Sequence, residues 1–304
     1  MVLSEAEHSA PTREPRAELF GISAALVTPF REDGAVDLPR AGSHAARVIA
    51  AGADGVTLFG TTGEGASLGS GDRAALLAAV LAAGVEASRI TACIVATSVE
   101  EAVRQAEAAL AEGVARFLLT PPFYFKGVAD DALFSWLSEV LRRLAAAEPR
   151  VLLYHIPQVT GVPVSPALAR RLRDVHGEIV FGVKDSAGDW ETSQRFLSHR
   201  DLAVLIGDER LLPRAAPLGG AGAISGMANL FPARLGRTIR TGAEDPAMQA
   251  LVDRIVKAPV TPLVKALVGA LHREAGWDRV RPPLSPADPA LVRALAAAVA
   301  AMAD

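Results

Sequence analysis

Residues 150–161 read RVLLYHIPQVTG, an apolar run that ends in a tyrosine, a histidine and a proline. Residues 178–185 read EIVFGVKD, a second apolar run that ends in a lysine and an aspartate. Each run has the length and the aliphatic content of a buried strand. Since a longer segment separates these two consecutive strands, they indicate a βαβ unit in a parallel sheet.

The same alternation extends in both directions along the chain. Six further strand-like runs are GISAALVT (21–28), GVTLFG (55–60), RITACIVA (89–96), ARFLLTP (115–121), LAVLIGD (202–208) and GAGAISG (220–226). Segments of helical spacing lie between them, and several begin with Ser or Asp and end in Gly, as helix caps require. Eight strand and helix repeats predict a (β/α)8 TIM barrel, with an open doubly wound sheet as the alternative.

The domain organisation follows from where this alternation begins and stops. Residues 1–18 are polar and of mixed charge, without the apolar stretch of a secretory signal, and we expect a loose tail. Residues 19–239 carry the predicted barrel. Residues 240–304 show helical patterns only, so we expect a C-terminal helical region that packs against the barrel or a neighbouring subunit.

Composition excludes several classes of protein. Of 304 residues, 50% are hydrophobic and 21% are charged, which is enough to bury a large core, and the net charge of −3 argues against nucleic acid as a partner. The sequence contains no run of about 20 uncharged apolar residues, so no membrane span is predicted. The single cysteine, Cys93, excludes an internal disulfide. We therefore expect a soluble, cytoplasmic protein.

Neither a metal nor a nicotinamide cofactor is predicted. The six histidines are scattered and show no ligand spacing such as HxxxH. The glycine-rich run GGAGAISG (219–226) contains a predicted strand and does not precede a helix, unlike a dinucleotide-binding turn.

Chemically able residues fall where predicted strands end, which is where TIM barrels carry their active sites. The first group is the set Gly60, Thr61, Thr62, Gly63 and Glu64, whose hydroxyls and backbone amides suit a carboxylate or a phosphate. The same sequence is also compatible with a Gly/Thr turn that has a purely structural role. The other two positions are Tyr154 and Lys184.

Lys184 is the strongest candidate for a nucleophile. Lysine occurs only at positions 126, 184, 257 and 265, and Lys184 alone lies on an apolar strand. Loss of hydration there favours the neutral, nucleophilic amine, although a strand-end lysine that reaches water fits the pattern equally well. Tyr154 ends the preceding strand, so its phenol and the amine share one mouth of the barrel. The second tyrosine, Tyr124, follows the fourth strand and faces the same end.

Several motifs together resemble the dihydrodipicolinate synthase and N-acetylneuraminate lyase family of class I aldolases. They are GTTGE (60–64), YHIP (154–157), GVKDSAG (182–188), GAGAIS (220–225) and PLVKAL (262–267). The resemblance runs from about residue 20 to residue 275. It implies a (β/α)8 barrel with a C-terminal helical region, assembled as a homotetramer from tight dimers.

The resemblance also implies roles for individual residues. Lys184 would form the Schiff base with pyruvate or another 2-oxo acid, and Tyr154 would act as the general acid and base. Thr61 and Thr62 would hold the carboxylate of the 2-oxo acid, and Thr61 would also relay protons. Tyr124 matches a tyrosine that the family contributes across the dimer interface, although the letters TPPFYF (120–125) also permit Phe123 in that position.

Other residues would complete the substrate site. Gly60 and Gly63 would bring backbone close to the substrate, and the main-chain carbonyl of Ile224 would lie near the imine. Lys265 resembles a structural helix residue of the family and is not assigned to the site.

Two positions depart from the synthase pattern. Dihydrodipicolinate synthases read YNVPSRTG where this chain reads YHIPQVTG (154–161), so Val159 stands where their arginine binds the carboxylate of the aldehyde substrate. Valine cannot pair with a carboxylate. His155 replaces the usual asparagine, either as a hydrogen-bonding group behind the site or as a purely structural residue.

The leading hypothesis is therefore a pyruvate-dependent class I aldolase or lyase without a cofactor. Its substrates would be a 2-oxo acid and an aldehyde, as for a 2-keto-3-deoxy sugar acid or 4-hydroxy-2-oxoglutarate. Three alternatives remain open. They are dihydrodipicolinate synthase, a dehydratase of the same family, and a catalytically silent protein that binds a sugar acid.

Overall fold

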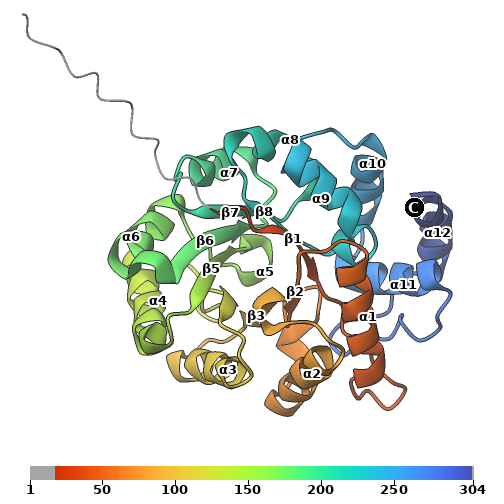
Figure 1. Cartoon of the computed structure of the whole chain (residues 1–304), viewed down its shortest axis with the longest axis horizontal. Helices are drawn as coiled ribbons and strands as arrows, with labels where there is room; N and C mark the ends of the chain where they lie inside the picture. Colours follow the sequence, from red (N-terminus) through yellow and green to blue (C-terminus); the bar gives the residue numbers. More distant parts are fainter. Residues whose placement is uncertain (1–17, 303–304) are drawn as a thin grey trace, which may run out of the picture.

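The computed structural model describes residues 18–302, and eight parallel strands in them close into a barrel in sequence order (Figure 1). The strands are β1 (Gly21–Ala25), β2 (Gly55–Leu58), β3 (Ile90–Ile94), β4 (Arg116–Leu119), β5 (Arg150–His155), β6 (Val180–Asp185), β7 (Ala203–Ile206) and β8 (Gly222–Ser225). Each predicted strand run contains one of them. The predicted TIM barrel is confirmed, and the doubly wound alternative is wrong.

Closure of the barrel depends on glycine where β8 meets β1. Gly21 and Gly222 are register partners, and Gly222 has a φ of +149°. A Cβ on Gly222 would lie 2.1 Å from the carbonyl oxygen of Gly21, which no side chain tolerates. The first and last strands therefore approach this closely only because residue 222 carries no side chain.

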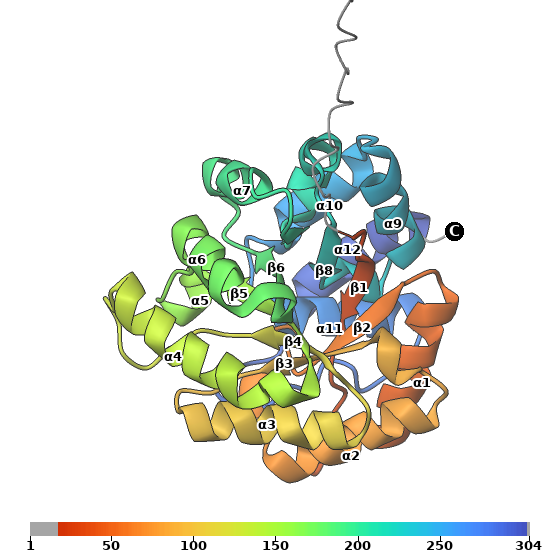
Figure 2. The same ribbon diagram turned by 60° about the vertical axis from the view of Figure 1, so that its left-hand side comes forward.

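Helices surround the strands on the outside, as Figure 2 shows for α2, α3 and α4. The helices of the barrel are α1 (Leu38–Ala50), α2 (Ser70–Ala82), α3 (Val99–Ala111), α4 (Asp130–Leu144), α5 (Pro157–Thr160), α6 (Pro166–His176), α7 (Trp190–Leu197), α8 (Leu212–Ala215) and α9 (Pro232–Thr241). Capping residues set several of their starts. Ser98 accepts a hydrogen bond from the amide of Glu101, and Asp189 accepts one from the amide of Thr192.

Three further helices form the C-terminal region, at one side of the barrel in Figure 1. They are α10 (Pro246–Ile255), α11 (Val260–His272) and α12 (Pro289–Met302). The last barrel helix, α9, ends at Thr241, so the proposed boundary at residue 239 falls within its last turn. Most of the expected tail, residues 1–17, lies outside the described residues.

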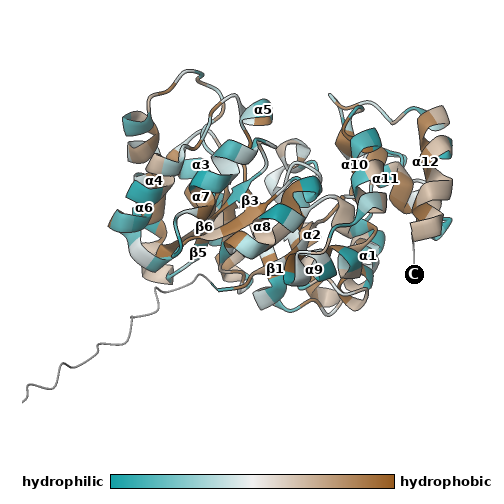
Figure 3. Ribbon diagram, turned by 90° about the horizontal axis from the view of Figure 1, so that it is seen from above, coloured by the Kyte–Doolittle hydropathy of each residue, from teal (hydrophilic) through white to brown (hydrophobic). Residues whose placement is uncertain are grey.

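Hydropathy follows this layered arrangement. Figure 3 shows apolar strands at the centre and more polar stretches on the outer helices, and every residue of β1, β2, β3 and β6 is buried. Among residues 18–302, no helix has both the length and the apolar character that a membrane span requires. The barrel interior is mostly apolar, and the candidate site lies at the ends of its strands.

One buried histidine is structural. The ring of His44 in α1 is fully buried, and its Nε2 lies 3.1 Å from the side-chain oxygen of Asn229. Asn229 in turn donates to the carbonyl of Ala25 in β1. Burial lowers the pKa of His44 to about 4, so the ring is neutral near pH 7. This pair ties α1 to the end of β1 and carries no site chemistry.

Candidate active site

Tyr154 and Lys184 lie side by side at the carboxyl end of the barrel. They are register partners in neighbouring parallel strands, so both side chains project from the same face of the sheet. The Nζ of Lys184 donates a 3.1 Å hydrogen bond to the Oη of Tyr154 and lies 4.3 Å from the centre of its ring. Both residues are buried, at 6% and 2% exposed. The structure thus joins an amine and a phenol away from bulk water.

The loop after β2 brings a hydroxyl to this pair. The Oγ1 of Thr61 lies 3.4 Å from the Oη of Tyr154, and either oxygen can donate. Lys184, Tyr154 and Thr61 therefore form a continuous chain of groups, each within hydrogen-bonding distance of the next. Lys184 and Tyr154 are covered, whereas Thr61 is exposed at the mouth of the barrel.

Left-handed backbone shapes this loop at both of its ends. Phe59 has a φ of 64° and Glu64 a φ of 55°, and neither is a glycine. Between them Gly63 packs so closely that a Cβ would lie 2.6 Å from the carbonyl oxygen of Leu26. Strained backbone of this kind persists only where surrounding contacts enforce it, and it concentrates at functional sites.

The other assigned substrate-binding residues surround the same mouth. The side chain of Thr62 lies next to the backbone that follows β8, since a Cβ on Gly226 would be 3.4 Å from it. Ile224 is buried within β8 and pairs with Ser23 of β1. Gly60 lines the cavity described next, and its carbonyl accepts a 3.0 Å bond from the amide of Gly65.

A cavity of about 340 Å³ opens beside the loop after β2. Its walls come from several elements, and those used below are Thr61, Cys93, Phe123, Val159, Thr261 and Leu284. Thr261 and Leu284 belong to the C-terminal region, which therefore forms part of the cavity wall. A 2-oxo acid or a short hydroxylated acid fits a space of this size.

The loop after β4 separates its three aromatic residues. Phe123 lines the cavity, whereas Tyr124 is 74% exposed and packs edge-to-face on Phe125 at 5.2 Å between ring centres. Within one chain, Tyr124 thus projects outward and Phe123 projects inward. The assignment of Tyr124 to a partner's site remains a prediction.

Val159 and His155 take different positions. Val159 lies in the short helix α5, is 58% exposed and lines the cavity. His155 neighbours Tyr154 in β5, and alternation along a strand turns it to the other face. There its Nδ1 accepts a 3.1 Å hydrogen bond from the amide of Val164, and its ring lies 5.5 Å from that of Phe196. Burial lowers the pKa of His155, so it acts as a neutral structural acceptor.

Cys93, a residue of the cavity wall, carries a thiol, which is a second potential nucleophile besides the amine of Lys184. It is buried in β3, and burial raises the pKa of its thiol to about 11. A thiol of this kind stays protonated near pH 7 and is a poor nucleophile. Cys93 is therefore not assigned a catalytic role.

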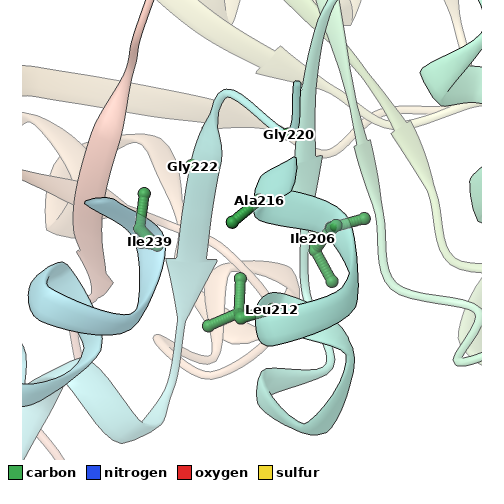
Figure 4. A pocket seen from close by; sticks show the side chains of 7 residues that line it. Ile206, Leu212, Ala216, Gly220, Gly222 and Ile239 are labelled. Atoms are coloured by element: carbon green, nitrogen blue, oxygen red, sulfur yellow. The ribbon is translucent and has the colours of Figure 1, made fainter. Parts of the chain in front are cut away.

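A second, much smaller cavity adds nothing to the site chemistry. Figure 4 shows the aliphatic side chains that surround a pocket between β7, β8, α8 and α9. The volume of this pocket is about 10 Å³, so it holds at most about one water molecule. Within residues 18–302, no three His, Cys, Asp or Glu side chains gather closely enough to hold a metal ion.

Two features of the site were not predicted from the sequence. The C-terminal region supplies cavity walls through Thr261 and Leu284, and Glu64 of the loop forms a buried ion pair with Lys265 of α11. The sequence did contain a sign of the ion pair, because Lys265 is one of only four lysines and lies in the middle of an apolar helical segment.

Comparisons with known proteins show the family of this chain. Residues 18–302 match the model of the dihydrodipicolinate synthetase family. A 4-hydroxy-tetrahydrodipicolinate synthase of Streptomyces coelicolor is 37% identical over 282 residues, covering 88% of this chain and 90% of that protein. An uncharacterized DapA-like lyase of Chloroflexus aurantiacus is 36% identical over 247 residues, covering 79% and 81%. The crystal structure of dihydrodipicolinate synthase from Agrobacterium tumefaciens superposes with a TM-score of 0.90 at 46% identity, covering 93% and 99%.

Proposed function

This chain belongs to the dihydrodipicolinate synthetase family and is a carbon–carbon lyase of the aldolase type, and we propose that Lys184 is the amine that binds its 2-oxo acid substrate covalently. The observation that carries this proposal is the contact of the Nζ of Lys184 with the phenol of Tyr154, 3.1 Å away and screened from water. An amine needs an adjacent proton donor and acceptor to form and break an imine.

The proposed reaction begins with attack of the neutral Lys184 amine on C2 of pyruvate. The resulting carbinolamine loses its hydroxyl as water and becomes an iminium ion, which withdraws electrons from C3. Loss of a C3 proton gives an enamine, and its C3 attacks the carbon of an aldehyde to form the new bond. The aldehyde oxygen takes up a proton, and water then hydrolyses the imine to release the product and the amine. Cleavage of a 4-hydroxy-2-oxo acid is the same sequence reversed.

The neighbouring residues fit the steps that this chemistry needs. Tyr154 would give and take the proton at the carbinolamine and at the aldehyde oxygen, with Thr61 relaying protons toward the mouth. Thr61 and Thr62 would hold the carboxylate, with Gly60 and Gly63 exposing backbone to it. The relay role of Thr61 is supported by its 3.4 Å approach to Tyr154.

A homotetramer built from dimers belongs to the same proposal. Tyr124 is exposed and projects away from its own cavity. In a tight dimer, an aromatic of this kind is free to complete the cavity of a partner subunit, as the family resemblance implies.

Trapping of the imine tests the proposal directly. Borohydride added with pyruvate should reduce the imine to a stable secondary amine, and mass spectrometry should find it on the peptide that contains Lys184. Protein left unmodified under saturating pyruvate, or modified only at Lys257 or Lys265, would contradict the assignment. The same result separates the imine enzymes from a silent sugar-acid binder.

The second candidate function is the synthase reaction, which condenses pyruvate with aspartate semialdehyde. The observation in its favour is the similarity to proteins named as synthases, at 37% and 46% identity. The observation against it is Val159, which lines the cavity where the synthases carry an arginine for the carboxylate of the semialdehyde. A charge-assisted contact of that kind is worth roughly 1.5 to 3 kcal/mol.

Substrate preference should follow Val159. We expect kcat/KM for a hydroxylated 2-oxo acid, such as 4-hydroxy-2-oxoglutarate or a 2-keto-3-deoxy sugar acid, to exceed that for pyruvate with aspartate semialdehyde. Val159→Arg should raise the semialdehyde reaction by roughly 10-fold or more and leave the other reaction unimproved. Steady-state kinetics of both proteins on both substrates measure this.

A faster semialdehyde reaction in the natural protein would mean that another cation replaces the arginine. Lys126 is then the first residue to test, because its Nζ donates a 2.7 Å bond to the carbonyl of Thr160, next to Val159. Lys126→Met should remove a preference that depends on this ammonium. Unchanged kinetics in that variant would exclude Lys126 as the substitute.

A further inference from the structure

Glu64 and Lys265 form an ion pair from which water is excluded. The Nζ of Lys265 lies 2.5 Å from the Oε1 of Glu64, and both side chains are 0% exposed. Burial lowers the pKa of Lys265, and the Glu64 carboxylate opposes that shift. Removing two charges from water is unfavourable and often gains no stability over an apolar pair. The pair therefore points to a role in holding the loop after β2 in one conformation.

The pair joins the loop after β2 to the C-terminal region at more than one point. The Oε2 of Glu64 accepts a 2.9 Å bond from the amide of Arg281, and Lys265 also donates to the carbonyl of Arg279 at 2.5 Å. The hydroxyl of Thr261 lies 3.3 Å from the carbonyl of Thr61. Residues 261–281 thus contact the loop at Glu64 and at Thr61.

The loop itself needs such support. Phe59 and Glu64 both have left-handed backbone, which costs of order 1 to 3 kcal/mol at a residue other than glycine. Glu64 is also the residue whose side chain makes the ion pair. External contacts at Glu64 and Thr61 therefore hold the strained loop in the one shape that presents Thr61 and Thr62.

We propose that Glu64 and Lys265 are positioning residues, which fix the loop after β2 from the C-terminal region so that Thr61 and Thr62 can bind the carboxylate of the substrate. The inference rests on the proposed function, because it takes the carboxylate of a 2-oxo acid as the group to be bound. Glu64 lines the cavity, but its carboxylate is bound by Lys265 and by the amide of Arg281, so we assign neither side chain a contact with the substrate.

The test compares two ketones that differ in the carboxylate. Borohydride trapping on Lys184 is measured against concentration for pyruvate and for hydroxyacetone, which has a ketone and no carboxylate. In Lys265→Met, half-saturation for pyruvate should rise about 10- to 100-fold, as for other misplaced binding groups, while hydroxyacetone changes less than about 2-fold. Equal losses for both ketones, or unchanged values for pyruvate, would overturn the positioning role.

Two further variants separate positioning from stability. The double variant Glu64→Gln, Lys265→Met leaves no unpaired charge in the interior, so we expect it to fold even if Lys265→Met alone does not. We expect its thermal stability to recover and its pyruvate half-saturation to stay raised, whereas recovery of both would show a purely structural role. The matched control is Arg47→Met, which breaks a 2.7 Å ion pair with Glu274 in the same C-terminal region, without contact to the loop. It should keep wild-type half-saturation for both ketones.

Hydrogen exchange gives a readout that does not depend on the chemistry. The amides of residues 59–65 should exchange at least about 10-fold faster in the Glu64→Gln, Lys265→Met double variant than in the natural protein, and Arg47→Met should not change them. Unchanged exchange in the double variant contradicts the proposal. If the natural protein traps neither ketone, the proposed function fails, and the exchange rates alone decide whether the loop is positioned by this pair.

Discussion

Replacing Lys184 by methionine should lower turnover by at least about 10⁴-fold, because the imine cannot form without the amine. Methionine has nearly the same length and volume, and the site is only 6% exposed. Because methionine keeps the packing, we expect the free energy of unfolding to change by less than about 1.5 kcal/mol. Steady-state kinetics and thermal denaturation of the same preparation check both parts.

The control for this variant is Lys257→Met, which removes an exposed lysine of the C-terminal region. It should keep full turnover and full trapping of pyruvate. Substantial activity in Lys184→Met, or a pyruvate adduct that survives in it, would show that another amine is the nucleophile. A loss of activity accompanied by loss of the folded state would be resolved by Lys184→Arg, which keeps the charge but is not a nucleophile at neutral pH.

The fold could be predicted because its signals are local. Each of the eight apolar runs contains a strand, and the segments between them carry caps such as Ser98. The predicted runs extend past the observed strands, as in residues 21–28 against Gly21–Ala25. Apolar residues after a strand can pack in a loop, so hydropathy alone does not mark where pairing stops.

The central pair of the site could be predicted for a related reason. Parallel strands that are consecutive in a barrel end at the same mouth, and Tyr154 and Lys184 stand at those ends. The orientation of His155 also follows from strand alternation, since it neighbours an inward-facing tyrosine. Its hydrogen bond from the amide of Val164 could not be read from the sequence.

Contacts distant in sequence could not be predicted from the same signals. Glu64 and Lys265 are 201 positions apart, and no local pattern states that they meet. The inward position of Phe123 and the outward position of Tyr124 depend on the loop after β4, whose path is fixed by Lys126 bonded to the carbonyl of Thr160. Loop paths of this kind depend on tertiary contacts more than on sequence propensity.

Tyr154→Phe should lower turnover by roughly 10² to 10⁴-fold, which is the range for loss of a general acid and base. The exchange removes one oxygen and keeps the packing of a ring that is 2% exposed. That oxygen contacts both Lys184 and Thr61, at 3.1 and 3.4 Å. Its loss therefore interrupts the proton path at its centre, while stability should change by less than about 1.5 kcal/mol.

The position of Tyr154 in the proton path makes two related variants informative. Thr61→Val keeps the phenol on Lys184 and removes only the outer hydroxyl, so it should reduce turnover less than Tyr154→Phe does. The double variant should fall by less than the product of the two single effects, because groups that act as one relay are not additive. Strict additivity would mean that Tyr154 and Thr61 act separately, and wild-type turnover in Tyr154→Phe would leave its ring as a packing residue only.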